Sequence, residues 1–255
     1  MHPTFGEEDK IHGEPAAVPK TTRAKVANFF YHYKWVALIT AVLLCAGIIC
    51  TVQICNRTSY DIYVMYAGTR SIMSTQSHTI AGTLADVADD YDGDGKKNIS
   101  FYPLYIADID ALTSEKNPNS GYLAAESKKN YDTFTSEIQT GNYLICMLSP
   151  KLFSSLDEEG IFLPVAEFSD TVPDAALCGK NKTGVRLSAL GIYAAPGFSS
   201  LPADTILCIR QPSAVSGWFT GKNETSNPEW WRDTDQYKHH ADMFRRLLTY
   251  VPAES

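Results

Sequence analysis

Positive charge is scarce over most of this sequence. Residues 57–255 contain 17 Lys and Arg residues against 25 Asp and Glu residues, a net charge of −8. Nucleic-acid phosphates attract proteins with the opposite balance, so this deficit argues against a nucleic-acid partner. The total length of 255 residues is enough for one sizeable globular domain and an appendage.

Short motifs that identify many enzymes are also missing. The sequence has no G-x-S-x-G, no H-E-x-x-H and no G-x-x-x-x-G-K-[ST]. His239 and His240 are adjacent, and on a helix their side chains would diverge by about 100°, too far to share a metal ion. We therefore predict no catalytic residue and no enzymatic activity, and the sequence identifies no ligand-binding residue. A hydrolase with a site of unfamiliar pattern is the alternative.

Cysteine is rare, and no C-x-x-C pair of the metal-binding kind occurs. Three of the six cysteines lie in one long apolar stretch (Cys45, Cys50 and Cys55), and Cys146 lies in an apolar run that predicts a buried strand. Only Cys178 and Cys208 remain to pair in an oxidising compartment, so we predict a disulfide between them.

Charge of either sign is absent from Trp35 to Asn56. About 20 apolar residues in a helix cross the roughly 30 Å hydrocarbon core of a bilayer, so we predict a transmembrane helix at 35–56, with Trp35 as an interfacial anchor. A cleaved signal peptide would have a shorter apolar core and a small-residue cleavage site, and no such site follows Cys50. The pattern therefore indicates an uncleaved signal anchor.

The residues that flank this span predict its orientation. Four of the five Lys and Arg residues between Pro15 and Tyr60 precede the span, which by the positive-inside rule places the N-terminus in the cytoplasm. Residues 1–34 are polar with little to pack, so we expect a disordered cytoplasmic tail. The expected location is the cell membrane, crossed once, with the bilayer around residues 35–56 and a C-terminal domain, 57–255, outside the cell.

Alternating apolar and amphipathic segments predict an α/β fold for residues 57–255. The predicted strands are 61–68, 99–106, 143–149, 184–195 and 205–211, and the predicted helices are 74–91, 131–140 and 150–159, the last stopped by Gly160. A final helix is expected to begin near Asn227, with Pro228 at its first position, and Pro103 suits an edge strand or a bulge. This order predicts one three-layer α/β domain with a mainly parallel sheet.

Two local patterns surround the predicted strand at 143–149. The preceding helix ends in Glu137–Gly141, a Glu-aliphatic-x-x-Gly pattern, and the following helix runs into Leu156–Val165, which ends in Gly-aliphatic-x-Pro-aliphatic. Over roughly residues 61–168 this arrangement resembles the extracellular solute-binding proteins of bacterial ABC importers. The resemblance implies one lobe of a periplasmic-binding-protein fold, because the 90 residues after Val165 suffice to complete only one lobe. It transfers no ligand-binding residue to this chain.

The acidic stretch DDYDGDGKKN, residues 89–98, is the candidate metal site. Counted from Asp90, aspartates occupy positions 1, 3 and 5 (Asp90, Asp92 and Asp94) and glycine occupies position 6, as in an EF-type calcium loop. Position 12 is Phe101, which cannot ligate, and two lysines occupy positions 7 and 8. We therefore favour a solvated turn between a helix and a strand, with no cofactor, over a calcium site.

These features leave functions from three classes. We expect a membrane-anchored, non-enzymatic extracellular domain that binds a partner protein or a surface component. The alternatives are the hydrolase and a small-molecule receptor, for a sugar or a peptide, completed by dimerisation or by a transporter subunit. A pocket lined by Tyr, Trp and acidic residues at the strand ends after Gly68, Ile106 and Ser149 would favour the receptor.

Overall fold

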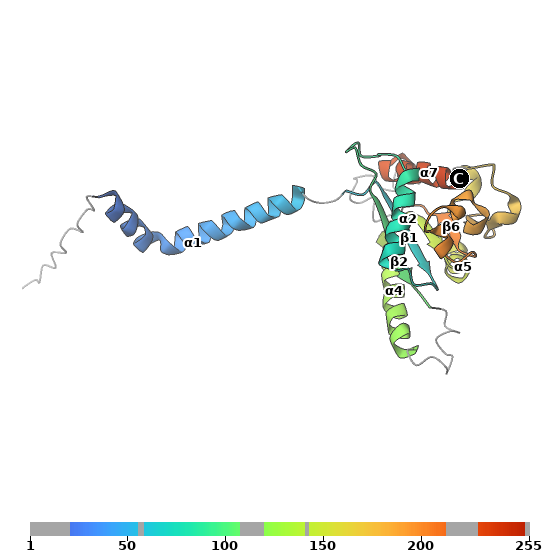
Figure 1. Cartoon of the computed structure of the whole chain (residues 1–255), viewed down its shortest axis with the longest axis horizontal. Coiled ribbons are helices and arrows are strands. Elements are labelled where there is room, and N and C mark those ends of the chain that lie inside the picture. Colours follow the sequence, from blue (N-terminus) through green and yellow to red (C-terminus); the bar gives the residue numbers. More distant parts are fainter. Residues whose placement is uncertain (1–20, 56–58, 108–119, 141–142, 213–228, 253–255) are drawn as a thin grey trace, which may run out of the picture. The chain divides into compact units, whose positions relative to one another are not determined.

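The computed structural model describes residues 21–55, 59–107, 120–140, 143–212 and 229–252 (Figure 1). The chain divides into two units, Met1–Thr58 and Ser59–Ser255. In the first unit, helix α1 (Thr22–Cys55) begins well before the span predicted at 35–56, so it includes the end of the predicted tail. Its segment Tyr33–Gln53 is long and apolar enough to cross a membrane, judged by its 21 residues and a mean hydropathy of 2.5.

In the second unit the described strands form one mixed six-stranded sheet of order β2-β1-β3-β6-β5-β4. Their bounds are β1 Ile62–Gly68, β2 Ile99–Tyr105, β3 Ile145–Leu148, β4 Leu177–Cys178, β5 Gly184–Arg186 and β6 Ile206–Ile209. β1 lies parallel to β2 and β3, whereas the β3–β6, β6–β5 and β5–β4 pairs are antiparallel. The α/β class is confirmed, and the expected mainly parallel sheet is wrong.

The connections explain this difference. Helices α2 (Ser74–Val87) and α4 (Ser120–Thr140) return the chain to the starting end of the sheet before β2 and β3, as parallel strands require. β4 and β5 are instead joined by the short hairpin 179–183. β5 is followed by three short 3-10 turns, Leu187–Ala189, Gly191–Ala194 and Phe198–Ser200, and not by a crossover helix. The second half of the sheet is therefore antiparallel.

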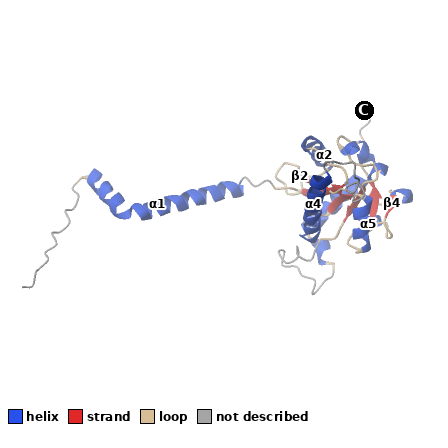
Figure 2. Cartoon of the chain, turned by 90° about the horizontal axis from the view of Figure 1, so that it is seen from below, coloured by secondary structure: helices blue, strands red, loops and turns tan. Residues whose placement is uncertain are grey.

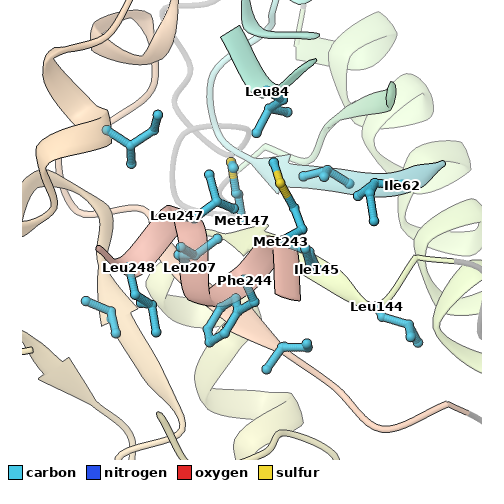
Figure 3. Close-up of a cluster of buried hydrophobic side chains, with 14 of the residues drawn as sticks. Ile62, Leu84, Leu144, Ile145, Met147, Leu207, Met243, Phe244, Leu247 and Leu248 are labelled. Carbon is cyan, nitrogen blue, oxygen red and sulfur yellow. The ribbon is translucent and has the colours of Figure 1, made fainter. Parts of the chain in front are cut away.

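Helices cover both faces of this sheet, so the domain has three layers (Figure 2). On one face, Ile62 and Val64 of β1 pack with Leu84 of α2 and with Phe244 and Leu247 of α7 (Asp235–Leu248), as Figure 3 shows for much of this cluster. On the other face, the side chains of β1, β3 and β6 pack against α4 and α5 (Pro150–Glu158), and the buried members of that cluster include Met65, Ala67, Cys146, Phe134 and Phe153. Each fully buried Leu or Phe stabilises the fold by about 1.5–3 kcal/mol.

Pro103 lies in β2, which is the edge strand next to β1. The carbonyl of Asn98 accepts the N–H of Asp61, and the N–H of Ile106 donates to Gly68, so the even-numbered residues of this strand face β1. Pro103 therefore faces away from β1, and its missing N–H removes no bond from the sheet. The predicted edge position is confirmed, and the proline also weakens pairing with another chain.

Three predicted boundaries differ from the structure. α4 begins at Ser120, well before the start predicted at residue 131, because its polar first half lacks the apolar periodicity from which a helix is predicted. The segment 184–195 is a strand only at β5, and thereafter it turns in 3-10 steps that bury Leu187, Leu190 and Ile192. The last helix begins at Asp235 and is capped by Thr234, whose hydroxyl accepts the N–H of Tyr237. The cap predicted at Asn227 and Pro228 lies outside the described residues.

The predicted disulfide is also wrong, because Cys178 and Cys208 are both free thiols. Cys178 of β4 and Cys208 of β6 each pair with Gly184 of β5, so a whole strand lies between them. Two strand spacings amount to about 9–10 Å, whereas a disulfide needs Cα atoms closer than about 7 Å. Cys208 instead faces Cys146 of β3, and burial raises the pKa of the Cys146 thiol to about 12.

His240 of α7 is a buried polar contact between this helix and the sheet. Its Nε2 accepts the N–H of Tyr63 at 3.1 Å, and its Nδ1 lies 2.7 Å from the carbonyl of Gln236, to which it donates. Both ring nitrogens are thus used by a neutral imidazole. Burial, with a smaller contribution from the charges of His239 and Arg210, lowers the pKa of His240 from 6.5 to about 4.

We predict that acid destabilises the domain through His240. Below pH 6.5 the unfolded chain binds a proton at His240 that the folded chain takes up only near pH 4, so the stabilisation present above pH 6.5 is lost as pH falls toward 4. The expected loss is about 3 kcal/mol. Urea unfolding of the full chain in detergent, followed by tryptophan fluorescence from pH 7 to 4, measures it.

The neighbouring histidine provides the matched control. His240→Gln should be less stable at neutral pH and should lose the slope in this window, whereas His239→Gln should keep it. An equal slope in wild type and His240→Gln would contradict this account.

Candidate ligand-binding site

The course of the chain around β1 determines where a ligand can enter. From β1 the chain runs through α2 on one face to β2, and then through α4 on the other face to β3, on the opposite side of β1. The direction of winding therefore reverses between β1 and β3. In open α/β sheets, ligands bind outside the carboxyl ends of the strands at such a reversal.

A pocket of about 660 Å³ lies at this place. Its lining comes from the carboxyl ends of β1, β2 and β3, the start of β6, and helices α4 and α5. The described residues of the lining are Tyr66, Thr69, Ile106, Ala107, Ala124, Ser127, Lys128, Tyr131, Ser149, Pro150, Lys151, Leu152, Ser155, Pro202, Asp204 and Thr205. The volume and the mixture of apolar wall and polar groups are typical of small-molecule sites.

Hydroxyl groups from three neighbouring strands contribute to the lining. Tyr66 belongs to β1, Ser149 directly follows β3, and Thr205 directly precedes β6. β6 is antiparallel to β3 and pairs Ile206 with Leu148, so its first residues lie beside the last residues of β3. Burial raises the pKa of the Tyr66 phenol, so this group remains a hydrogen-bond donor at neutral pH.

Helix α4 is held against the end of β2 by two side chains. The hydroxyl of Ser127 accepts the N–H of Ala107 at 2.9 Å, and the amide of Asn130 donates to the carbonyl of Tyr105 at 2.8 Å. Both backbone groups lie where β2 leaves the sheet. These bonds set the position of α4 and thus of Lys128 and Tyr131 in the pocket wall.

Helix α5 begins at the pocket. Ser149 is its N-cap and Pro150 its first residue, where proline sacrifices no helical hydrogen bond. The Ser149 side chain makes no capping bond, although its carbonyl accepts the N–H of Phe153 at 3.0 Å. Residues 149–152 line the pocket, so the first turn of α5, with its partial positive charge, lies at the pocket wall.

The described lining contains two lysines, Lys128 and Lys151, one carboxylate, Asp204, and neither histidine nor cysteine. Hydroxyls and charges suit hydrogen bonding to a polar ligand. The base that normally activates a serine nucleophile is not among these groups. The tyrosines and the acidic residue expected at the strand ends are present, but Trp230 and Trp231 lie in the hydrophobic core, and Trp218 is outside the described residues.

The acidic loop lies at the other end of the sheet, between the end of α2 and the start of β2. Oxygen atoms of Asp61, Asp90 and Asp92 lie within 4.8 Å of one another, and Asp94 is outside this described group. Asp61 was not among the candidates, because its place in the sequence next to an apolar run gave no sign of the contact. Phe101 at position 12 lies in β2.

The carboxylates of this loop accept backbone N–H groups of the loop itself. Asp61, only 8% exposed, accepts from Tyr91, Asp92 and Asn98 at 2.8–3.1 Å. Other bonds of the same kind run from Gly93 and Gly95 to Asp90, from Asp94 to Asp92, and from Lys96 to Asp94. The loop joins a helix to a strand as a carboxylate-capped turn. That it serves as a turn without a bound cation stays a prediction.

No protein-family model matches the chain, and comparison with curated proteins and with solved structures gives no significant match. The resemblance to solute-binding proteins therefore stays a prediction from the local patterns quoted above.

We predict that Asp61 holds the acidic loop in place. Asp61→Asn replaces an acceptor oxygen by an amide donor that faces the N–H groups of the loop, and the expected loss is about 1–3 kcal/mol in the free energy of unfolding. Asp94→Asn keeps an oxygen for Lys96 and is the matched control, with an expected change below about 0.5 kcal/mol. Urea unfolding of both variants, with and without millimolar calcium, measures these effects.

Calcium should change neither value. A loss for Asp94→Asn as large as that for Asp61→Asn, or a calcium-dependent gain that both variants abolish, would contradict the turn.

Proposed function

We propose that residues 59–255 bind a small polar molecule in the pocket at the carboxyl ends of β1, β2 and β3, without transforming it. The observation that carries this proposal is the coincidence of the pocket with the winding reversal between β1 and β3. Of the functions expected from the sequence, this promotes the small-molecule receptor above the partner-binding domain, since no described surface indicates a particular protein partner.

The proposal includes a membrane tether. Tyr33–Gln53 supplies a helix of sufficient length and apolarity, and the excess of cations before it supports an N-terminus in the cytoplasm. The domain with its pocket then lies outside the cell, in contact with extracellular solutes. A single sheet and its two helical layers form the binding unit, so binding requires no closure of a second lobe.

We predict that filling the pocket abolishes binding. Ala124 of α4 lines the pocket, and Ala124→Trp would place an indole in it. Ala125 is exposed on the same helix and does not line this pocket, so Ala125→Trp is the matched control. Ligand-observed NMR with the full chain in detergent, against a panel of amino acids, sugars, organic acids and nucleotides, should identify compounds that bind wild type and Ala125→Trp but not Ala124→Trp.

Thermal unfolding of the two variants first establishes that both are folded. A panel in which no compound distinguishes Ala124→Trp from Ala125→Trp would refute the proposed function.

The orientation predicts which cysteines are accessible from outside the cell. In a Cys178→Ser background, an impermeant maleimide added to intact cells should label Ser154→Cys, which is exposed on α5, and should not label Thr21→Cys. Both should react after permeabilisation. The reverse pattern in intact cells would place the domain in the cytoplasm.

A further inference from the structure

We infer that the pocket binds the oxyanionic group of its ligand, a carboxylate or a phosphate, between the Tyr66 and Thr205 hydroxyls and the first turn of α5. This inference rests on the proposed function and adds the chemical class of the ligand.

Tyr66 supplies a buried donor without an acceptor. The residue is 1% exposed and lines the pocket. Its ring lies over the last residue of β1: a Cβ added at Gly68 would be 2.7 Å from the phenol oxygen. The oxygen accepts the N–H of Arg70 at 3.3 Å, and within the described part of the chain no group accepts the phenol hydrogen. A buried donor in this state costs free energy until an acceptor reaches it.

The hydroxyl of Thr205 is a second buried donor without an acceptor in the described part of the chain. The residue is also 1% exposed and lines the pocket, and its backbone N–H and carbonyl are bonded to Pro202 and Leu187. Its hydroxyl has no hydrogen-bond partner among the described residues. Two hydroxyls that are almost completely buried, from β1 and from the start of β6, are thus available to a molecule in the pocket.

Two sources of positive charge in the pocket lining favour an anion. The first turn of α5 carries the partial positive charge of a helix of nine residues, and Lys128 of α4, also in the lining, adds a full charge. This setting differs from residues 57–255 as a whole, whose net charge is −8. An anionic group of the ligand would accept hydrogen bonds from both hydroxyls, and the positive charges would stabilise it.

Asp204 limits the ligand further. Its carboxylate is exposed and also lines the pocket, and its charge helps to raise the pKa of Tyr66, so it lies near the phenol. A second anionic group beside Asp204 would be repelled, whereas a hydroxyl or amino group there would donate to it. The site therefore suits a small molecule with one anionic group and a hydrogen-bond donor.

Pairs of probes that differ in charge test the inference. The probes are propionate with propionamide, L-lactate with L-lactamide, and sn-glycerol 3-phosphate with glycerol, each titrated at millimolar concentration into the full chain in detergent and followed by NMR. At least one anion should bind in a saturable way and more tightly than its neutral partner. If lactate or propionate is the anion that binds, the group recognised is a carboxylate. If only glycerol 3-phosphate binds, it is a phosphate.

Tyr66→Phe and Thr205→Val remove the two hydroxyls with little change in shape. Each should weaken binding of the anion about tenfold or more, the effect expected for a hydrogen bond to a charged group. Tyr193→Phe and Thr79→Val are the matched controls, because these hydroxyls donate to Leu201 and Thr75 and do not line the pocket. Thermal unfolding establishes that all four variants are folded.

The outcomes separate this inference from the proposed function. Neutral probes that bind as tightly as the anions, or anion binding that is unchanged in Tyr66→Phe and Thr205→Val, overturn the oxyanion site and leave the pocket as a binding site. Failure of every anion to bind also overturns it, and the comparison of Ala124→Trp with Ala125→Trp then decides the proposed function independently.

Discussion

The reversal of winding at β1 is the constraint on which the rest of the molecule depends. β1 is buried on both faces and pairs in parallel on both sides, so the chain must return twice to the same end of the sheet, once along each face. The second of these returns, α4, supplies one wall of the pocket where β1 and β3 end. The ends of β1, β2 and β3, the start of β6 and the start of α5 supply the rest of the lining.

Buried polar groups lie at both ends of the sheet. At the amino end, Asp61 accepts three backbone N–H groups and both ring nitrogens of His240 are bonded, so these two residues are satisfied within the fold. Oε2 of Glu137, in the last turn of α4, is buried without a hydrogen-bond partner among the described residues. Nearby, Arg210 is 3% exposed and donates to the carbonyls of Tyr143 and Glu137, which ties β6 to the last turn of α4. At the carboxyl end, Tyr66 and Thr205 are equally buried and keep unused hydrogen-bonding capacity. The hydroxyls of Tyr66 and Thr205 line the pocket, so a ligand bound there can use this capacity.

Local patterns in the sequence predict the elements that depend on local physics. The apolar runs of β1, β2 and β3 were identified to within two residues, Gly160 stops α5 with a φ of +72°, and Pro103 lies on an edge. The direction of β6, the turns after β5 and the separation of Cys178 from Cys208 depend on long-range pairing, which single-sequence patterns do not contain. The strand ends could be named as the place to look, but Tyr66 and Thr205 could not, because a tyrosine in an apolar run reads as core.

The central claim is that a ligand binds at the winding reversal, and hydrogen–deuterium exchange tests it most directly. Exchange is measured for the full chain in detergent, with and without a compound whose binding Ala124→Trp abolishes. The account predicts slower exchange in the segments that end β1, β2 and β3 and begin α5 and β6, namely 66–70, 105–107, 148–153 and 204–206. It predicts no change in the acidic loop at 89–98. Protection confined to the acidic loop, or spread over the outer face of α2 and α7 with none at the strand ends, would contradict a ligand site at the winding reversal.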